Sequence, residues 1–168
     1  LNNEKEDLEV QLYKLLPEIE VRVIEPFDVA NVLPPNSVLI EYQKFRPFKF
    51  QNPTDALGVK SWGEARYQAL ILKPNGEIQS VDLGLAALID EYVQKALLAS
   101  EQSLADAQAL WSEVGQLVVA PLAKATAGRK TWFISPDGEL NRIPFAALSS
   151  TNRDVLLGEE INLRLLTT

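Results

Sequence analysis

The chain has 168 residues and a mass of 18.7 kDa, the size of a single domain with its own core. Its 23 Asp and Glu residues outnumber its 16 Lys and Arg residues, so the net charge is −7. Nucleic acids and anionic membranes attract basic surfaces, so we expect neither as a partner. No apolar run reaches the roughly 18 residues of a membrane-spanning helix, which predicts a soluble protein.

Three residue types are missing altogether: cysteine, histidine and methionine. Without Cys and His, the chain by itself assembles no disulfide, no thiolate site and no Ser-His-Asp or Cys-His site. We therefore expect no catalytic residue, no metal site and no cofactor in this chain. Because Leu1 stands where an initiator Met would, we expect a piece of a longer polypeptide; N-terminal processing is the alternative. The lack of Cys suits a cytoplasmic protein.

Residues 1–20 have the pattern of a charged amphipathic helix that ends at Pro17. Its apolar positions recur at helical spacing: Leu8, Leu12, Leu15 and Leu16. A single leucine stripe needs a surface to pack on. That surface is either the chain's own domain or an upstream helical array.

The next segment predicts a helical turn, a strand and a loop. Asp28 is expected to cap a short turn that ends before Pro34. Residues 37–45 are rich in β-branched and aromatic types, which predicts a strand. Residues 46–66 mix prolines, glycines and charges, which predicts a long surface loop.

Two strands, 67–73 and 77–83, flank an Asn75-Gly76 pair that favours a tight hairpin turn. Apolar residues at helical spacing then predict helices over 84–99 and 103–124. The side chains expected to face the core are Leu88, Tyr92, Leu110, Val114 and Leu117.

Two further strands are predicted at 131–135 and 161–167. The first is expected to be a buried central strand that carries Trp132, Phe133 and Ile134. The order of elements predicts an α/β protein with a small parallel or mixed sheet of about four to six strands, flanked by helices.

Few patterns suggest chemistry. The carboxylate pairs Asp90-Glu91 and Glu159-Glu160 are adjacent in sequence, so their side chains diverge and do not flank one substrate bond. Residues 44–50 mix cations with aromatic rings, as single-stranded nucleic-acid platforms do. In so acidic a chain, a packed loop or a protein-contact loop is favoured instead.

The stretch SPDGELNRIPFAAL combines a strand end, a turn and a short helical piece. Asp137-Gly138 supplies the turn, and Pro144 sets the backbone at the start of the piece that contains Phe145. Arg142 is placed to pair with a carboxylate or to bond free carbonyl groups. These five residues form the candidate motif for a structural role or for contact with a partner.

The run PDGELNRIPFAAL resembles the signature of the CHAT domain family, caspase-like domains found with tetratricopeptide repeats. Other pieces follow the family's order along the chain: LPPNSVLIEY, ALILKPNGEI, VDLG, VVAPL, TWFISPDG and LLGEEINLRLL. Together they cover residues 28–168, and the helix at 1–20 resembles the tail of the helical-repeat region that often precedes such domains. The loop at 46–66 is longer than the family's usual connection and is interpreted as an insertion.

The resemblance implies that residues 28–168 fold like the N-terminal, pseudo-peptidase half of a caspase-like domain. The family's His-Gly and Cys lie C-terminal to this part, and no position here matches either. It therefore implies a non-catalytic scaffolding or regulatory portion of a bacterial cysteine peptidase. Its partners would be a downstream catalytic half and upstream helical repeats, or a second copy in a homodimer. The alternative is a stand-alone protein–protein interaction module whose parent has no protease.

Overall fold

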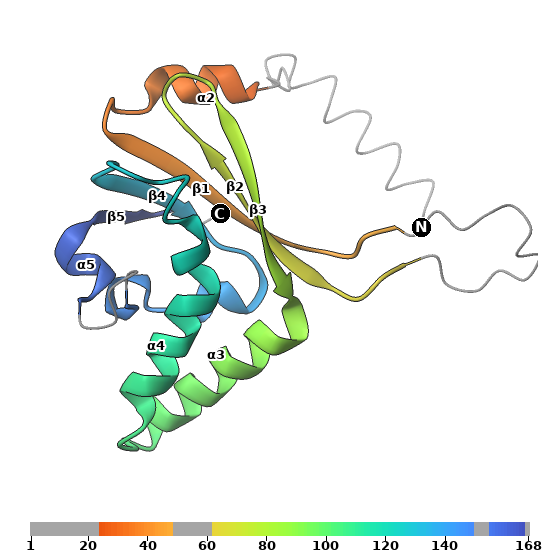
Figure 1. The fold of residues 1–168 in the computed structure, drawn as a ribbon, viewed down its shortest axis with the longest axis vertical. Helices are drawn as coiled ribbons and strands as arrows, with labels where there is room; N and C mark the ends of the chain where they lie inside the picture. The colour runs from red at the N-terminus through yellow and green to blue at the C-terminus, as the bar shows by residue number, and fades with distance from the viewer. Residues whose placement is uncertain (1–23, 49–61, 150–154, 167–168) are drawn as a thin grey trace, which may run out of the picture.

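The computed structural model describes residues 24–48, 62–149 and 155–166. Within them, five strands form one mixed sheet with helices packed around it (Figure 1). The strands are β1 (Ser37–Phe45), β2 (Arg66–Leu72), β3 (Ile78–Leu85), β4 (Thr131–Ser135) and β5 (Asn162–Leu165). The helices are α2 (Pro26–Val32), α3 (Ala86–Glu101), α4 (Ala107–Val118) and α5 (Leu157–Glu160). The predicted α/β class is confirmed, whereas the helix predicted at 1–20 lies outside the described residues.

The strand order is β3-β2-β1-β4-β5, and the pairing changes from antiparallel to parallel at β1. The strands β1, β2 and β3 are antiparallel neighbours, whereas β4 is parallel to β1 and β5 is parallel to β4. It follows that β3 and β4 point the same way, and such strands need a crossover connection. The helices α3 and α4 provide it.

The strand predictions hold closely because the local patterns are strong. The bounds of β1 are those predicted, and its alternate residues Val38, Ile40 and Tyr42 are buried on one face. The hairpin at Asn75-Gly76 is also confirmed, since β2 and β3 pair antiparallel around it. Gly76 has a φ of +82°, a backbone conformation that glycine adopts without strain.

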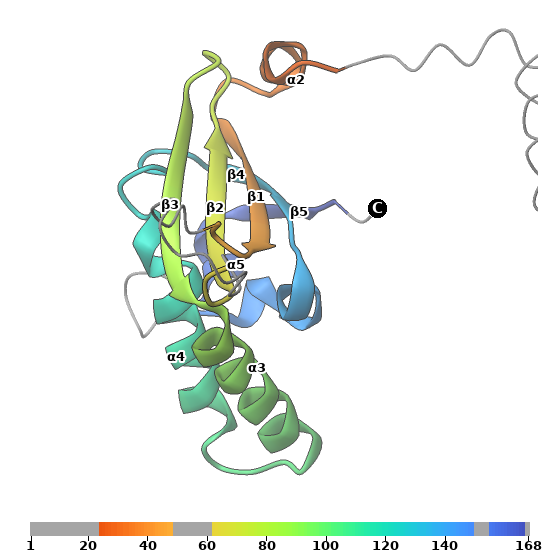
Figure 2. The ribbon, with the colours of Figure 1, turned by 90° about the vertical axis from the view of Figure 1, so that its right-hand side faces the viewer.

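The helices α3 and α4 pack side by side against one face of the sheet (Figures 1 and 2). We call this side the helix face, and the opposite side the open face. The helix-face strand residues in the core include Val38, Ile40, Tyr67, Ala69, Ile71, Trp132 and Ile134. From the helices, the buried residues that join them include Ala86, Ile89, Val93, Ala96, Val114 and Val118.

One predicted core residue is wrong. The side chain of Leu88 is 46% exposed, whereas its neighbour Ile89 is buried. The apolar stripe of α3 is wide enough to allow two rotations about the helix axis. Packing selects the rotation that buries the side with Ala86, Ile89, Val93 and Ala96. Of the other residues expected inside, Val114 is buried, and Tyr92, Leu110 and Leu117 are half-buried against the core.

The second helix is shorter than predicted. Instead of running over 103–124, α4 ends at Val118, and a 3-10 turn, η1 (Ala120–Leu122), follows. Pro121 lies in that turn, because proline lacks the N–H that another helical turn would use.

The C-terminal strands also differ in detail from the prediction. The strand β4 lies second from the edge of the sheet, not at its centre. Trp132 and Ile134 are buried on the helix face, while Phe133 is half-buried on the open face. The predicted strand at 161–167 is the shorter β5.

The helix α2 begins earlier than expected. Asp28 does not cap it from outside but lies inside its first turn, where its Oδ2 accepts a hydrogen bond from the Glu25 N–H at 3.1 Å. Pro26 starts the helix because its fixed φ suits the first helical position.

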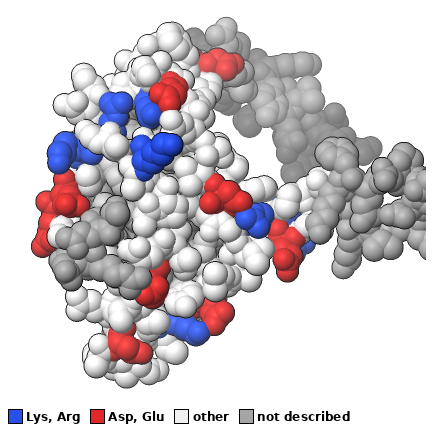
Figure 3. Space-filling view, viewed as in Figure 1, with Lys and Arg blue, Asp and Glu red and all other residues white. Residues whose placement is uncertain are grey.

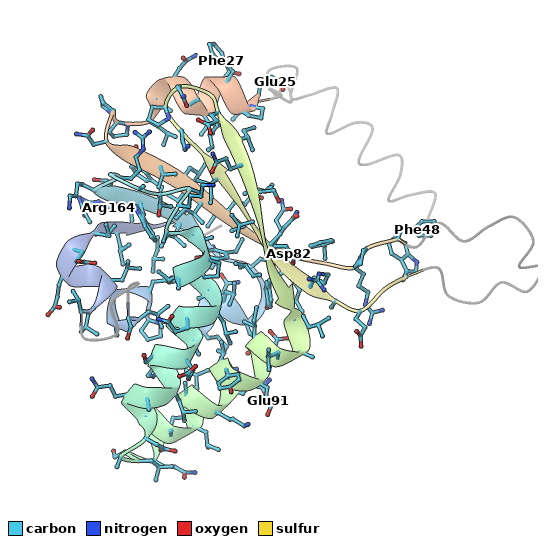
Figure 4. The ribbon with its side chains drawn as sticks, viewed as in Figure 1. Glu25, Phe27, Phe48, Asp82, Glu91 and Arg164 are labelled. Atoms are coloured by element: carbon cyan, nitrogen blue, oxygen red, sulfur yellow. The ribbon has the colours of Figure 1, made fainter. Side chains whose placement is uncertain are left out.

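The loop predicted at 46–66 is partly a continuation of the β1–β2 ribbon. Phe48 and Trp62 form an isolated antiparallel bridge, and their rings meet edge to face with centroids 5.1 Å apart. Phe48 lies far out on this arm, away from the helices (Figure 4). Residues 49–61 lie outside the described part of the chain.

Candidate functional site

The Asp137-Gly138 turn fastens the end of β4 to β1. The last register pair between these strands is Glu41 with Ser135. Beyond it, Asp137 continues the connection with its side chain: its Oδ2 accepts a hydrogen bond from the Lys44 N–H at 2.8 Å. Its Oδ1 accepts another from the Gly138 N–H at 2.7 Å. The carboxylate therefore replaces the β-ladder where the strand has ended.

Gly138 is required at this turn for two reasons. Its φ of +57° lies in the left-handed region that favours glycine. A Cβ at this position would lie 2.5 Å from the hydroxyl oxygen of Tyr67, closer than two such atoms approach. The turn therefore fits tightly over the Tyr67 side chain.

Tyr67 lies at the centre of a polar cluster under this turn. It comes from β2 and is fully buried. Its hydroxyl donates a hydrogen bond to Asp90 Oδ1 of α3 at 2.9 Å and accepts one from the Glu139 N–H at 3.1 Å. The hydroxyl thus joins the sheet, the helix α3 and the 3-10 turn η2 (Gly138–Arg142).

Lys44 completes the cluster from β1. Its Nζ donates a hydrogen bond to Asp90 Oδ2 at 2.7 Å and lies 5.6 Å from the centroid of the Tyr67 ring. The side chains of Lys44 and Asp90 are 35% and 19% exposed, so water screens this ion pair only in part. We call Lys44, Tyr67, Asp90 and Asp137 the Tyr67 cluster.

The electrostatics of the cluster favour a structural role. Burial raises the pKa of the Tyr67 hydroxyl, and the hydrogen bond to Asp90 raises it further. A tyrosine that acts as a base or nucleophile needs a lowered pKa, so that its ionised form is accessible. Here the neutral hydroxyl is stabilised instead, and both oxygens of Asp90 are engaged.

The other residues of the candidate motif separate in space. Phe145 is buried and packs against the ring of Tyr42 with centroids 5.6 Å apart. Pro144 precedes the 3-10 turn η3 (Phe145–Ala147), as the sequence suggested for a short helical piece. Arg142 donates to Glu139 Oε2 at 2.8 Å, and its side chain is 52% exposed. Of the five motif residues, Asp137 belongs to the Tyr67 cluster and Gly138 lies over Tyr67. Phe145 lies in the core, and Arg142 and Pro144 are exposed.

The carboxylates of Asp90 and Glu91 diverge as expected. Asp90 points into the cluster, whereas Glu91 pairs with Lys95 on the outer side of α3 at 2.5 Å (Figure 4). In the second pair, Glu159 Oε2 accepts a hydrogen bond from the Leu156 N–H at 3.1 Å. Where the structure describes the chain, no three His, Cys, Asp or Glu side chains gather as metal ligands do.

Sequence reasoning missed Tyr67, and it considered Asp90 only as half of a carboxylate pair. A signal for Asp90 was available. It falls beside Ile89 and three residues before Val93, so it interrupts the apolar side of a helix. An acidic residue there needs a polar partner, because unpaired charge is costly to bury.

A second feature is the edge strand β5; of the described strands, β3 forms the other edge of the sheet. The strand β5 pairs with β4 on one side, and no other described strand lies on its far side. Leu165 and Leu166 are 54% and 43% exposed there. Backbone donors and acceptors along an unpaired edge, next to exposed leucines, can accept another strand.

The face shown in Figure 3 carries Lys and Arg together with Asp and Glu, separated by uncharged surface. Arg164 of β5 contributes a cation near the free edge (Figure 4). None of the helices in the described ranges is long and apolar enough to cross a membrane.

Comparisons with protein-family models, with curated proteins and with solved structures found no match to this chain.

Proposed function

We propose that this chain is the non-catalytic, scaffolding part of a caspase-like peptidase of the CHAT type, in the bacterial cytoplasm, and that it positions a downstream catalytic half. The run PDGELNRIPFAAL and the ordered pieces around it support this family assignment. The five-stranded mixed sheet with helices is compatible with it at the level of fold class.

The observation that carries the proposal is the free edge of β5. Leu165 and Leu166 are exposed next to it. A catalytic half that adds a strand to β5 would continue the parallel part of the sheet and cover these leucines. The sheet edge then gives affinity through backbone hydrogen bonds, and the leucines give specificity.

In this arrangement the Tyr67 cluster has a supporting role. It fixes the turn after β4 to β1, β2 and α3. Because β4 is the neighbour of β5, a rigid β4 holds the free edge in a defined position. The Arg142 side chain on the same turn is available for contact with the catalytic half.

The first test is to sequence the coding region beyond Thr168. A His-Gly pair and a Cys within roughly one further domain length support the proposal. Their absence overturns the peptidase assignment and leaves the alternative, a stand-alone interaction module.

The second test uses the chain together with that downstream half. Leu165→Asp should weaken association of the two halves at least about tenfold, because it puts a charge at the centre of an apolar contact. Leu98→Asp is the matched control, since Leu98 is 53% exposed on α3 and lies away from β5. Equal effects of the two variants on the dissociation constant, measured by titration calorimetry, would contradict a contact at β5.

Peptidase activity supplies an independent readout in the joined halves. It should fall in the Leu165→Asp variant and vanish when the downstream Cys is changed to Ala. If this chain forms a homodimer through β5 instead, sedimentation equilibrium of the chain alone will show a dimer that Leu165→Asp dissociates.

A further inference from the structure

The open face of the sheet carries an apolar groove beside α2. Its volume is about 250 Å³. Seven apolar residues and one exposed carboxylate line it: Ile24, Pro26, Val29, Leu39, Leu70, Leu72, Ile78 and Glu41. It lies on the side of the sheet opposite α3 and α4, because its β1 and β2 residues alternate with the buried helix-face residues. We call it the α2 groove.

One apolar row crosses the groove. Leu39 is the register partner of Leu72 across β1 and β2, and Leu72 is the partner of Ile78 across β2 and β3. Cross-strand neighbours on one face touch, so these three side chains form a row across three strands. Ile78 is 52% exposed, and the described part of the chain covers this row only from the α2 side.

The described part of the chain begins at a residue of this groove. Ile24 is the first described residue, and it lines the groove. Phe27 of α2 lies at the same end of the molecule, near the β2–β3 turn (Figure 4). The segment connected to Ile24 contains the leucine stripe noted in the sequence, which needs an apolar surface.

We propose that the leucine stripe of the N-terminal segment, Leu8 to Leu16, packs into the α2 groove of its own chain. Leu16 precedes Ile24 by eight residues. An extended connection of that length reaches at most about 29 Å, so the stripe is confined to the neighbourhood of the groove.

The short connection between Leu16 and Ile24 favours the N-terminal segment over a separate molecule as the occupant of the α2 groove. A short connection holds the segment at an effective concentration in the millimolar range, so weak apolar contact suffices for docking. An isolated helix as short as this one is only marginally stable in water, so docking and helix formation support each other. The inference rests on the groove and the stripe and is independent of the proposed function.

The absence of cysteine makes the proposal directly testable in the full chain. In a Leu12→Cys, Leu70→Cys variant, one cysteine lies on the stripe and the other in the groove. A Lys14→Cys, Leu70→Cys variant is the matched control, because position 14 lies on nearly the opposite side of the helix from the stripe. The measured quantity is the rate of disulfide formation under mild oxidation, with monomer and dimer separated by gel.

The intramolecular disulfide should form at least about tenfold faster in the Leu12 variant than in the Lys14 variant. Equal rates would overturn the proposal. Faster formation of a disulfide-linked dimer at low protein concentration would also overturn it, because a second copy would then occupy the groove.

Hydrogen exchange gives a second readout without cysteines. Backbone amides at 8–16 should exchange at least about tenfold more slowly than in an unstructured peptide, and Leu12→Gln should abolish this protection while Lys14→Gln preserves it. Amides of α3 serve as the folding control in each variant. Unprotected amides at 8–16 in the unmodified chain would refute the packing.

Discussion

The two faces of the sheet are built from the same strands but stabilise the protein differently. On the helix face, neighbouring strand residues such as Ile40 and Ile71 are completely buried beneath α3 and α4. On the open face, the intervening residues Leu39 and Leu70 are only half-buried, beside α2. Strand alternation thus creates two candidate interfaces, and only tertiary packing selects which of them becomes the core.

The largest expected effect compares adjacent residues on the two faces. Ile71→Ala should destabilise the protein by about 2–5 kcal/mol, because it leaves a cavity in a closed core. Leu70→Ala should cost clearly less, because Leu70 is half-buried in the groove. Urea unfolding followed by circular dichroism measures both. A larger loss for Leu70→Ala would reverse our assignment of the faces.

A second comparison tests the turn that closes the helix face. Gly138→Ala should cost about 1–3 kcal/mol, because it adds backbone strain and a clash with the Tyr67 hydroxyl. Gly128→Ala is the control: Gly128 also has a positive φ, +75°, but no atom lies within 4 Å of its added Cβ. The excess loss of unfolding free energy in Gly138→Ala measures the clash. If the two variants lose equal stability, the turn does not fit tightly over Tyr67.

The third prediction concerns the hydroxyl of Tyr67. Tyr67→Phe should cost about 1–2 kcal/mol, because Asp90 and the Glu139 N–H each lose a hydrogen-bond partner. Tyr92→Phe provides a control on α3, where the tyrosine is half-buried. Thermal unfolding of both variants should separate them by several degrees. Indistinguishable midpoints would show that the cluster contributes no net stability.

The smallest expected effect on stability comes from the ionisation of two buried tyrosines and can be measured only at alkaline pH. Burial raises the pKa of both Tyr42 and Tyr67 above the ordinary value of 10.0. The unfolded chain therefore releases these protons first. Their contribution to stability is complete below pH 10 and is lost as the pH rises toward the folded-state pKa values.

Urea midpoints between pH 8 and pH 11 test this prediction, since that range spans the ordinary tyrosine pKa of 10.0. The decline should begin near pH 10 and become shallower in Tyr67→Phe, which keeps only the Tyr42 contribution. A decline of unchanged slope in that variant would mean that Tyr67 ionises normally.

Local patterns were sufficient for most of the sheet. The bounds of β1 and β4 and the Asn75-Gly76 turn follow from alternation and turn chemistry, which act over a few residues. The rotation of α3 about its own axis could not be predicted from the local sequence. Leu88 and Ile89 both belong to its apolar stripe, and only contact with the sheet selects Ile89 for burial.

In the candidate site, contacts between residues close in sequence could be predicted, whereas contacts between distant residues could not. The sequence placed a turn at Asp137-Gly138 and suggested that Arg142 pairs with a carboxylate, which is Glu139. These interactions span a few residues. The contact of Asp137 with the Lys44 N–H spans 93 residues and depends on β4 lying beside β1.

The α/β class, the main strands and the need for a turn after β4 could be predicted from local sequence, because each depends on short-range spacing and backbone preference. Tertiary packing selects which face of the sheet is closed, places β3 and β5 at the edges of the described sheet, and brings Tyr67 to Asp90 under Gly138. These features depend on strand order and on side chains distant in sequence. Long-range packing fixes them, and no local pattern encodes it.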